Sequence, residues 1–250
     1  MRAWLTKLKA GTEHLNYGRD VIAEMIRRGV PSLPQGPARI LDVGMGSGED
    51  LLRAREAVAP SPAELHGLDS YAPNVRAAEK RGIAAAVCNV ERERFPYEDS
   101  FFHAVIANQV LEHSKEIFWI VSEVSRVLAP GGVFVAGVPN LASLHSRVML
   151  LLGMQPSPIE VLGPHVRGFT RGGFERFIRA DGYFEVLAVR GSNFYPFPPA
   201  VARPLARALP AMSVSLFFAC LRTQKPGRFA EVLGSRFFET DYFRGPAGSQ

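Results

Sequence analysis

The sequence predicts an α/β fold built on a doubly wound, mostly parallel sheet of seven strands. Between residues 39 and 139, short apolar runs alternate with longer amphipathic segments. Parallel neighbouring strands need crossover connections, and helices of this length supply them. Further along, two strand-like runs follow one another with only a connecting segment between them. We therefore expect a Rossmann-like sheet with an antiparallel edge strand.

The first five strands are each expected to end at a turn or at the start of a helix. Their predicted ranges are 39–43, 64–69, 83–88, 102–107 and 133–139. Helices are predicted at 49–58, from Pro73 to Gly82, and from about Leu111 to Leu128. Proline suits the first turn of a helix and glycine its end, which supports the second helix. The stretch "APGG" (129–132) predicts a turn into the fifth strand.

Further elements are expected at both ends of this region. Residues 12–28 carry an apolar stripe at helical spacing. After Asn140 we expect a helix-like insertion with prolines, then a helix at 171–180, a strand at 184–189, a helix near 202–209 and a strand at 213–221. The predicted division is a helical cap at 1–36, a main domain at 37–222 with a substrate-cap insertion at about 141–168, and a tail at 223–250.

Composition limits the classes of function. The chain has 250 residues, of which 47% are apolar and 21% charged, as is ordinary for a globular domain. The net charge of +5 comes from arginines spread along the chain, so no nucleic-acid partner is expected. No apolar run approaches the roughly 20 residues that span a bilayer, and no signal-peptide pattern is visible. We expect a cytoplasmic protein with no integral membrane segment and with Cys88 and Cys220 as buried thiols; the oligomeric state is left open.

The stretch "ILDVGMGSGEDL" (40–51) is the most informative in the chain. A strand ends in it, glycines follow at 44, 46 and 48, and an acidic helix begins. Ligands of doubly wound sheets bind at such turns, where glycine lets the backbone approach closely. A dinucleotide requires G-x-G-x-x-G, whereas here Glu49 replaces the third glycine and would repel a pyrophosphate. The spacing favours S-adenosylmethionine, which has an amino-acid end and no phosphate.

Asp69 ends the second predicted strand, 21 residues after Gly48. A carboxylate at this place can accept hydrogen bonds from both ribose hydroxyls of an adenosine ligand. Nicotinamide-dinucleotide enzymes use the same arrangement, so Asp69 indicates adenosine without separating the two cofactors. A surface aspartate in a turn is the alternative interpretation.

Four blocks of sequence together resemble the class I S-adenosylmethionine-dependent methyltransferases, especially the small-molecule group that includes the ubiquinone and menaquinone O-methyltransferases. The blocks are "ILDVGMGSGEDL", "GLDS", "FPYEDSFFHAVIANQVLEH" and "EVSRVLAPGGVFVAGVPN", in the family's order over residues 39–140. A later segment, "HVRGFTRGGFERFIRADGYFEV", extends the resemblance to about residue 190. The resemblance implies S-adenosylmethionine as the cofactor and a small molecule as the methyl acceptor.

The resemblance also implies which residues bind the cofactor. Asp42 would orient the turn or the amino group, and Asp69 would hold the ribose. Asn89 would bond the adenine amine, and Asn108 with Gln109 would face the methionine end. The full expected set is Asp42, Gly44, Gly46, Gly48, Asp69, Asn89, Asn108 and Gln109. The departures from the family pattern are Asn89 and His103, each in place of an aspartate, and Met45 in place of a frequent cysteine.

Two histidines are candidates for a catalytic base. Methyl transfer depends mostly on orientation, but an oxygen acceptor can need a base near neutral pH. His113 follows Glu112 beside the expected methyl position; a cap or packing role is the alternative. His165 lies in the insertion expected to cover the acceptor, with Arg167 as a candidate anion clamp; a helix-entry role is the alternative. No Asp/His cluster at metal-ligand spacing is visible, so no metal site is expected.

The predicted function is methyl transfer to a small-molecule acceptor, with oxygen as the expected acceptor atom. The apolar segment Leu141–Leu152 suggests an acceptor with an apolar part, although a core helix would look the same. Tyr17 or Arg19 of the N-terminal helix could contact the cofactor, or that helix could simply pack on the sheet. A non-catalytic binding or scaffold protein is the alternative function, but it would be marked by a damaged glycine turn or a lost acid, and both are intact.

Overall fold

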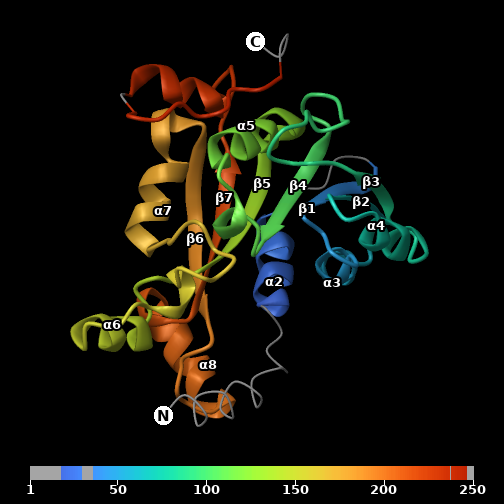
Figure 1. Cartoon of the computed structure of the whole chain (residues 1–250). Coiled ribbons are helices and arrows are strands. Elements are labelled where there is room, and N and C mark those ends of the chain that lie inside the picture. The colour runs from blue at the N-terminus through green and yellow to red at the C-terminus, as the bar shows by residue number, and fades with distance from the viewer. Residues whose placement is uncertain (1–17, 30–35, 237, 247–250) are drawn as a thin grey trace.

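The computed structural model describes residues 18–29, 36–236 and 238–246. Its centre is a seven-stranded sheet in the order β3-β2-β1-β4-β5-β7-β6 (Figure 1). β1 to β5 run parallel, whereas β7 lies between β5 and β6 and is antiparallel to both. The strands are β1 (Ala38–Val43), β2 (Ala63–Asp69), β3 (Ala84–Val87), β4 (Phe102–Asn108), β5 (Leu128–Pro139), β6 (Phe184–Ser192) and β7 (Ser215–Arg222). The predicted fold class is confirmed, with the antiparallel pair completing one edge.

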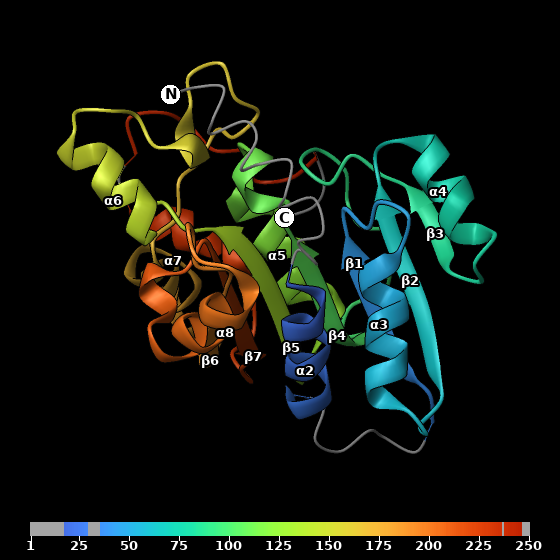
Figure 2. The same ribbon diagram turned by 90° about the horizontal axis from the view of Figure 1, so that it is seen from below.

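Helices cover both faces of this sheet (Figure 2). The α-helices among the described residues are α2 (Arg19–Gly29), α3 (Glu49–Val58), α4 (Ala72–Glu79), α5 (Ile117–Val127), α6 (Leu144–Leu151), α7 (Arg171–Ile178) and α8 (Pro199–Ala208). α2, α3 and α4 contribute to one buried cluster, together with Ile40 of β1. α5, α7 and the 3₁₀ segment η5 (Phe229–Ser235) contribute to the other, together with Leu41. Consecutive residues of β1 thus enter opposite cores, as strand geometry requires.

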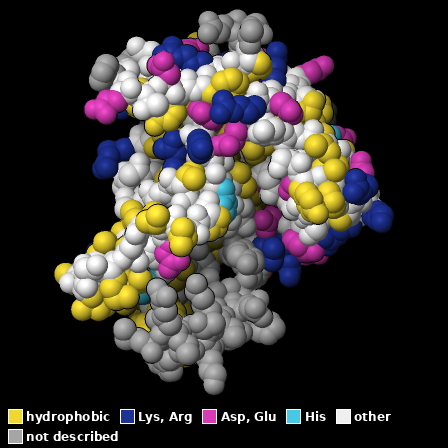
Figure 3. All heavy atoms as spheres, viewed as in Figure 1, with side chains coloured by type: hydrophobic (Ala, Val, Ile, Leu, Met, Phe, Trp, Pro, Cys, Tyr) yellow, Lys and Arg dark blue, Asp and Glu magenta, His cyan; other side chains and the backbone are white. Residues whose placement is uncertain are grey.

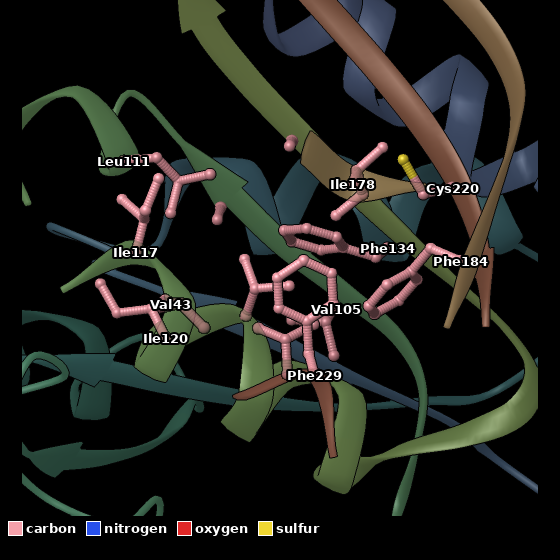
Figure 4. Packing of buried hydrophobic residues seen from close by; sticks show 14 of the residues in the cluster. Val43, Val105, Leu111, Ile117, Ile120, Phe134, Ile178, Phe184, Cys220 and Phe229 are labelled. Carbon is pink, nitrogen blue, oxygen red and sulfur yellow. The ribbon is translucent and has the colours of Figure 1, made fainter. Parts of the chain in front are cut away.

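The core on the α5 side is dominated by aromatic rings. Figure 4 shows Phe134, Phe184 and Phe229 meeting from β5, β6 and η5. The ring centroids of Phe134 and Phe184 are 5.8 Å apart, and those of Phe184 and Phe229 are 6.2 Å apart. Such contacts fasten the antiparallel edge of the sheet to the segment that follows β7.

The helix predicted at 111–128 is divided in the structure. It begins as a 3₁₀ turn, η1 (Leu111–His113), and α5 starts only at Ile117. The carbonyl of Ser114 between them accepts a hydrogen bond from the Arg167 side chain at 3.1 Å instead of continuing a helix. No proline or glycine marks the break at residues 114–116, so the sequence pattern alone predicted one helix.

The fifth strand begins earlier than its predicted range. Leu128 pairs with Phe102, and the register then shifts so that Val133 lies opposite Ala104. The "APGG" residues 129–132 therefore lie outside the regular pairing. Gly131 has a φ of 84°, which glycine adopts at little cost. The predicted turn exists, but it is a bulge within the strand instead of its start.

The ends of the described chain pack on this framework. α2 begins at Arg19, and the part of its predicted range at 12–17 lies outside the described residues. In the tail, the ring of Tyr242 lies 4.9 Å from that of Phe118 in α5, centroid to centroid. Cys88 and Cys220 are buried free thiols, as predicted. Within the described ranges, no helix is long and apolar enough to cross a bilayer.

Candidate cofactor and catalytic site

The turn between β1 and α3 contains three glycines in the left-handed region, with φ of 73° at Gly44, 55° at Gly46 and 83° at Gly48. A Cβ on Gly44 would lie 2.6 Å from Val110, and one on Gly48 would lie 2.2 Å from Ile83. A Cβ on Gly46 would meet no heavy atom within 4 Å. Packing thus explains the glycines at 44 and 48, whereas Gly46 borders open space where a ligand can approach the backbone.

Asp69 lies against this turn at the end of β2, with its side chain largely buried. Its Oδ2 accepts hydrogen bonds from the Gly46 N–H at 2.9 Å and from the Asn74 side chain at 3.2 Å. Its Oδ1 accepts one from the Tyr71 N–H at 2.8 Å. A carboxylate has about four acceptor positions, so one remains on Oδ1. A ligand diol that used both oxygens would displace the Asn74 amide.

Three carboxyl groups gather beside the turn. Burial raises the pKa of Asp42 well above its usual value, and the charges of Asp50 and Asp69 raise it further, while Arg19 lowers it. Asp50 lies 3.3 Å from the Nε of Arg19 and accepts a hydrogen bond from Asn108 Nδ2 at 2.9 Å. Burial favours the neutral form of Asp42, and the two remaining carboxylates outnumber the one guanidinium, which favours a cationic ligand over a pyrophosphate.

Asn89 lies two residues after the end of β3, and Gln109 directly follows the end of β4. Asn89 is exposed, and its Oδ1 accepts a hydrogen bond from the Glu91 N–H at 3.1 Å, so this amide already closes its own turn. Gln109 has a φ of 57°, and its Nε2 is buried without a hydrogen-bond partner among the described residues. A left-handed non-glycine residue with an unused buried donor is typical of a functional position.

Glu112, His113 and His165 form a second group of side chains. Each offers a carboxylate oxygen or ring nitrogen within 4.8 Å of those of the other two. Glu112 is buried, neither of its carboxylate oxygens has a partner in the described part of the chain, and burial raises its pKa to about 7. This spacing could accommodate a divalent cation, so the expected absence of a metal site stays a prediction.

The two imidazole rings are 4.7 Å apart, centroid to centroid. Nδ1 of His113 lies 3.3 Å from the carbonyl of Pro164, and Nδ1 of His165 lies 3.0 Å from that of Pro158. A carbonyl only accepts hydrogen bonds, so Nδ1 must carry the proton in a neutral ring. This tautomer leaves the lone pair on Nε2, which can then accept a proton.

Backbone contacts hold the insertion in this place. The N–H groups of Val166 and Arg167 donate to the Glu112 carbonyl at 2.8 and 3.1 Å. The Arg167 guanidinium donates to the carbonyls of Ser114 and Lys115 at 3.1 and 2.6 Å. The Arg167 guanidinium, which the sequence offered as a candidate anion clamp, thus binds backbone carbonyls, and these bonds together hold His165 beside His113.

Comparison with known proteins identifies the domain that contains the glycine turn. Residues 41–136 match the family model described as a methyltransferase domain. The mouse mitochondrial ubiquinone biosynthesis O-methyltransferase is 26% identical over 185 residues, which are 70% of this chain and 47% of that protein. The demethylmenaquinone methyltransferase of Thermus thermophilus is 33% identical over 126 residues, which are 48% of this chain and 56% of that protein. The solved structure of geranyl diphosphate methyltransferase with S-adenosylmethionine has a TM-score of 0.54 at 17% identity, covering 87% of this chain and 90% of that chain.

Residues 41–136 thus carry a methyltransferase domain, and these relatives support its resemblance to the class I S-adenosylmethionine-dependent methyltransferases. The methyltransferase domain expected from the four sequence blocks is thereby confirmed. The aligned region spans about half the length of the curated relatives, and the structural likeness at 17% identity shows the fold alone. The methyltransferase-domain match contains the glycine turn, Asp69 and Glu112 but ends before His165.

Three features of this candidate site were missed from the sequence. Asp50 pairs with Asn108 from the first turn of α3, and its position two residues after Gly48 was a visible signal. Asn74 of α4 donates to Asp69, and its position five residues after that acid was a weaker signal. The burial of Glu112 had no local signal, because residues of the distant insertion cover it.

Proposed function

We propose that this chain transfers a methyl group from S-adenosylmethionine to an oxygen of a small molecule with an apolar part. The observation that carries the proposal is the 2.9 Å hydrogen bond from the Gly46 N–H to Asp69 Oδ2. It joins the candidate ribose acid to the glycine turn at the sheet edge where doubly wound folds bind ligands. The mouse relative, named as an O-methyltransferase of ubiquinone biosynthesis, supports an oxygen acceptor.

The residues around the turn fit this cofactor. The open space beside Gly46 allows close approach to the backbone. The carboxylates of Asp50 and Asp69 supply negative potential for the ammonium and sulfonium charges, whereas burial favours the neutral form of Asp42. Asn89 is assigned to the adenine amine, and Gln109 Nε2 is a free donor toward the methionine end. When bound, the cofactor supplies an electrophilic methyl group on sulfur.

The proposed base is the histidine pair. As the acceptor oxygen bonds to the methyl carbon and the carbon–sulfur bond breaks, the hydroxyl proton passes to Nε2 of His165 or His113. Glu112, once ionised, stabilises the imidazolium across the distance of at most 4.8 Å. General-base catalysis of this kind contributes about 10²- to 10⁴-fold. Single His→Gln substitutions should therefore lower kcat by about 10²-fold or more and flatten its pH dependence.

The cofactor is tested by calorimetric titration with S-adenosylmethionine, S-adenosylhomocysteine and NADH. We expect both sulfur nucleotides to bind and NADH not to bind. Asp69→Ala should weaken binding by about 10²-fold, the cost of roughly two charge-assisted hydrogen bonds. Glu56→Ala, which removes an exposed acid of α3, is the matched control and should bind normally. Failure of the wild-type chain to bind either sulfur nucleotide would refute the proposal.

The acceptor class is tested with methyl-labelled cofactor and phenols that carry alkyl chains. We expect label in the product, with mass spectrometry placing the new methyl on oxygen. Methylation only at carbon would overturn the oxygen assignment while leaving the cofactor assignment intact. The His113→Gln and His165→Gln variants, checked for unchanged cofactor affinity, then separate a catalytic from a packing role.

A further inference from the structure

The insertion after β5 exposes an unusual amount of apolar surface. Large apolar side chains are mostly exposed at the end of α6 and in the loop that follows: Leu151 at 86%, Leu152 at 70%, Val161 at 84% and Leu162 at 100%. Figure 3 shows hydrophobic side chains gathered over α6. Single exposed apolar residues need no explanation, but a group of this kind marks an interaction surface.

α8 and the segment before it extend this apolar surface into one lobe. Leu144 of α6 packs against the buried group formed by Phe194, Ala202 and Ala206. The rings of His145 and Tyr195 are 5.5 Å apart, centroid to centroid. α6 and α8 lie at the same end of the molecule in both ribbon views (Figures 1 and 2). Phe197, Val201 and Leu209 add partly exposed apolar side chains, from 42% to 47%.

The charge of this lobe is strongly one-sided. We define the lobe as residues 141–168 and 187–214, which contain five arginines and a single acid, Glu160. It therefore holds four of the five net positive charges of the whole chain. Arg203 and Arg207 lie exposed on α8 and form no ion pair with a described residue.

We propose that this lobe binds the surface of an anionic phospholipid bilayer, with the leucines entering the interface and the arginines meeting the headgroups. Apolar side chains next to basic ones are the combination that interfacial segments use. A second copy of the chain fits less well, because a two-fold contact through this lobe would oppose arginines to arginines. The proposal goes beyond methyl transfer and does not depend on it.

The lobe also lies beside the candidate site. It follows the carboxyl end of β5, and Asn140 there forms a β-bridge with Phe169, which directly follows the insertion. The same insertion carries His165 to His113. Docking on a bilayer would thus bring the acceptor side of the site to the lipid surface.

The test is co-sedimentation of the full chain with vesicles of phosphatidylcholine alone or mixed with phosphatidylglycerol. We expect binding to the anionic vesicles that weakens with salt, and little binding to the neutral ones. Leu151→Asp with Leu162→Asp should lower binding by at least about tenfold, since it removes the inserted side chains. Arg203→Glu with Arg207→Glu should also lower it by about tenfold or more.

Matched controls make the result specific to the lobe. Val87→Asp on β3 and Arg55→Glu on α3 each introduce an acid at an exposed position outside the lobe, and these variants should bind like the wild type. Circular dichroism and the melting temperature check that each variant is folded, so the test needs no enzymatic activity. The proposal would be overturned if the wild type did not bind vesicles, or if both lobe variants bound them as strongly as the wild type. A dimer that Leu151→Asp with Leu162→Asp dissociates, without vesicle binding, would assign the lobe to self-association instead.

Discussion

Gly44 and Gly46 share a left-handed backbone but have different surroundings. Both would strain an alanine, at a cost of about 1–2 kcal/mol each. Only Gly44 also faces a stiff side chain, because a Cβ there would lie 2.6 Å from a γ-methyl of Val110. The two positions therefore separate the packing role of the turn from its ligand role.

Gly44→Ala should cost about 2–4 kcal/mol of unfolding free energy, because overpacking adds to the backbone strain. Gly46→Ala should cost only about 1–2 kcal/mol. It should nevertheless weaken S-adenosylhomocysteine binding by about tenfold or more, because its methyl group would occupy the open space beside the turn. Urea unfolding and calorimetry of both variants check this pair. The prediction would be contradicted if Gly44→Ala and Gly46→Ala were equally stable and lost affinity for S-adenosylhomocysteine equally.

Glu112 should make stability depend on pH. Its pKa is raised to about 7 in the folded protein, against about 4.3 in an unfolded chain. Between these values the unfolded chain releases a proton that the folded protein keeps, so the unfolding free energy falls as the pH rises. The loss of unfolding free energy is absent below about pH 4 and reaches about 4 kcal/mol above pH 7.

Glu112→Gln removes this titration. The unfolding free energy of the variant minus that of the wild type should be larger at pH 8 than at pH 5. Urea unfolding of both proteins at the two pH values measures this difference. Glu56→Gln, at an exposed position of α3, controls for the loss of a carboxylate. If the Glu112→Gln difference were the same at both pH values, Glu112 would not be a buried carboxyl of raised pKa.

At the scale of elements, α5 contains a buried ion pair whose two side chains also bind the segment before β4. Arg126 NH2 lies 2.5 Å from Glu123 Oε2, and both side chains are at most 1% exposed. Arg126 also donates to the carbonyls of Phe95 and Tyr97, and Glu123 accepts from the Phe95 N–H. These bonds satisfy backbone groups that a turn would otherwise leave buried and unpaired.

Arg126→Met should therefore cost about 3–5 kcal/mol, because it leaves the Glu123 charge buried without its partner. Replacing both residues, Glu123→Leu with Arg126→Met, should cost less than the single change. Arg28→Met breaks the exposed pair of Arg28 with Glu24 on α2 and should cost no more than about 1 kcal/mol. Denaturant unfolding of the three variants measures the differences. A double variant no more stable than Arg126→Met would argue against an uncompensated charge.

The insertion and the loop after β4 depend on one another at this same scale. The sequence predicted a continuous helix at 111–128, and the break at 114–116 arises because Arg167 binds backbone carbonyls there. Helical periodicity records which side chains are apolar. It does not record that a distant arginine competes for the carbonyls of a helix start.

At the scale of the whole molecule, the candidate site joins elements that are distant along the chain. The glycine turn follows β1, Asp69 ends β2, and Asn108 ends β4. A ligand that contacts all three binds only the folded state, so it should stabilise the protein as a unit.

S-adenosylhomocysteine at about 100 times its Kd should add about 2.7 kcal/mol of stability. For a chain of this size, this corresponds to a rise in melting temperature of roughly 5–10 °C. NADH at the same concentration should cause no change, and Asp69→Ala, with its roughly 10²-fold weaker binding, should retain only about 0.4 kcal/mol of the stabilisation. Thermal unfolding followed by circular dichroism measures both. An undiminished rise in the melting temperature of Asp69→Ala would show that the ligand binds elsewhere than at the glycine turn.

Local patterns in the sequence determined the sheet, the glycine turn and Asp69. Strand and helix periodicity, the need for glycine at positive φ, and an acid at a strand end are properties of short stretches, so they can be read before folding. The same patterns predicted His113 and His165 only as separate candidates.

Only the tertiary structure decided that these histidines lie side by side and that Glu112 is buried. It likewise decided that the Arg167 side chain donates its hydrogen bonds to backbone carbonyls. It also decided that Gly46, and not Gly44 or Gly48, borders open space. Each of these facts depends on contacts between residues tens of positions apart. Burial and proximity are properties of the packed molecule, because a side chain's surroundings come from elements that its own stretch of sequence does not contain.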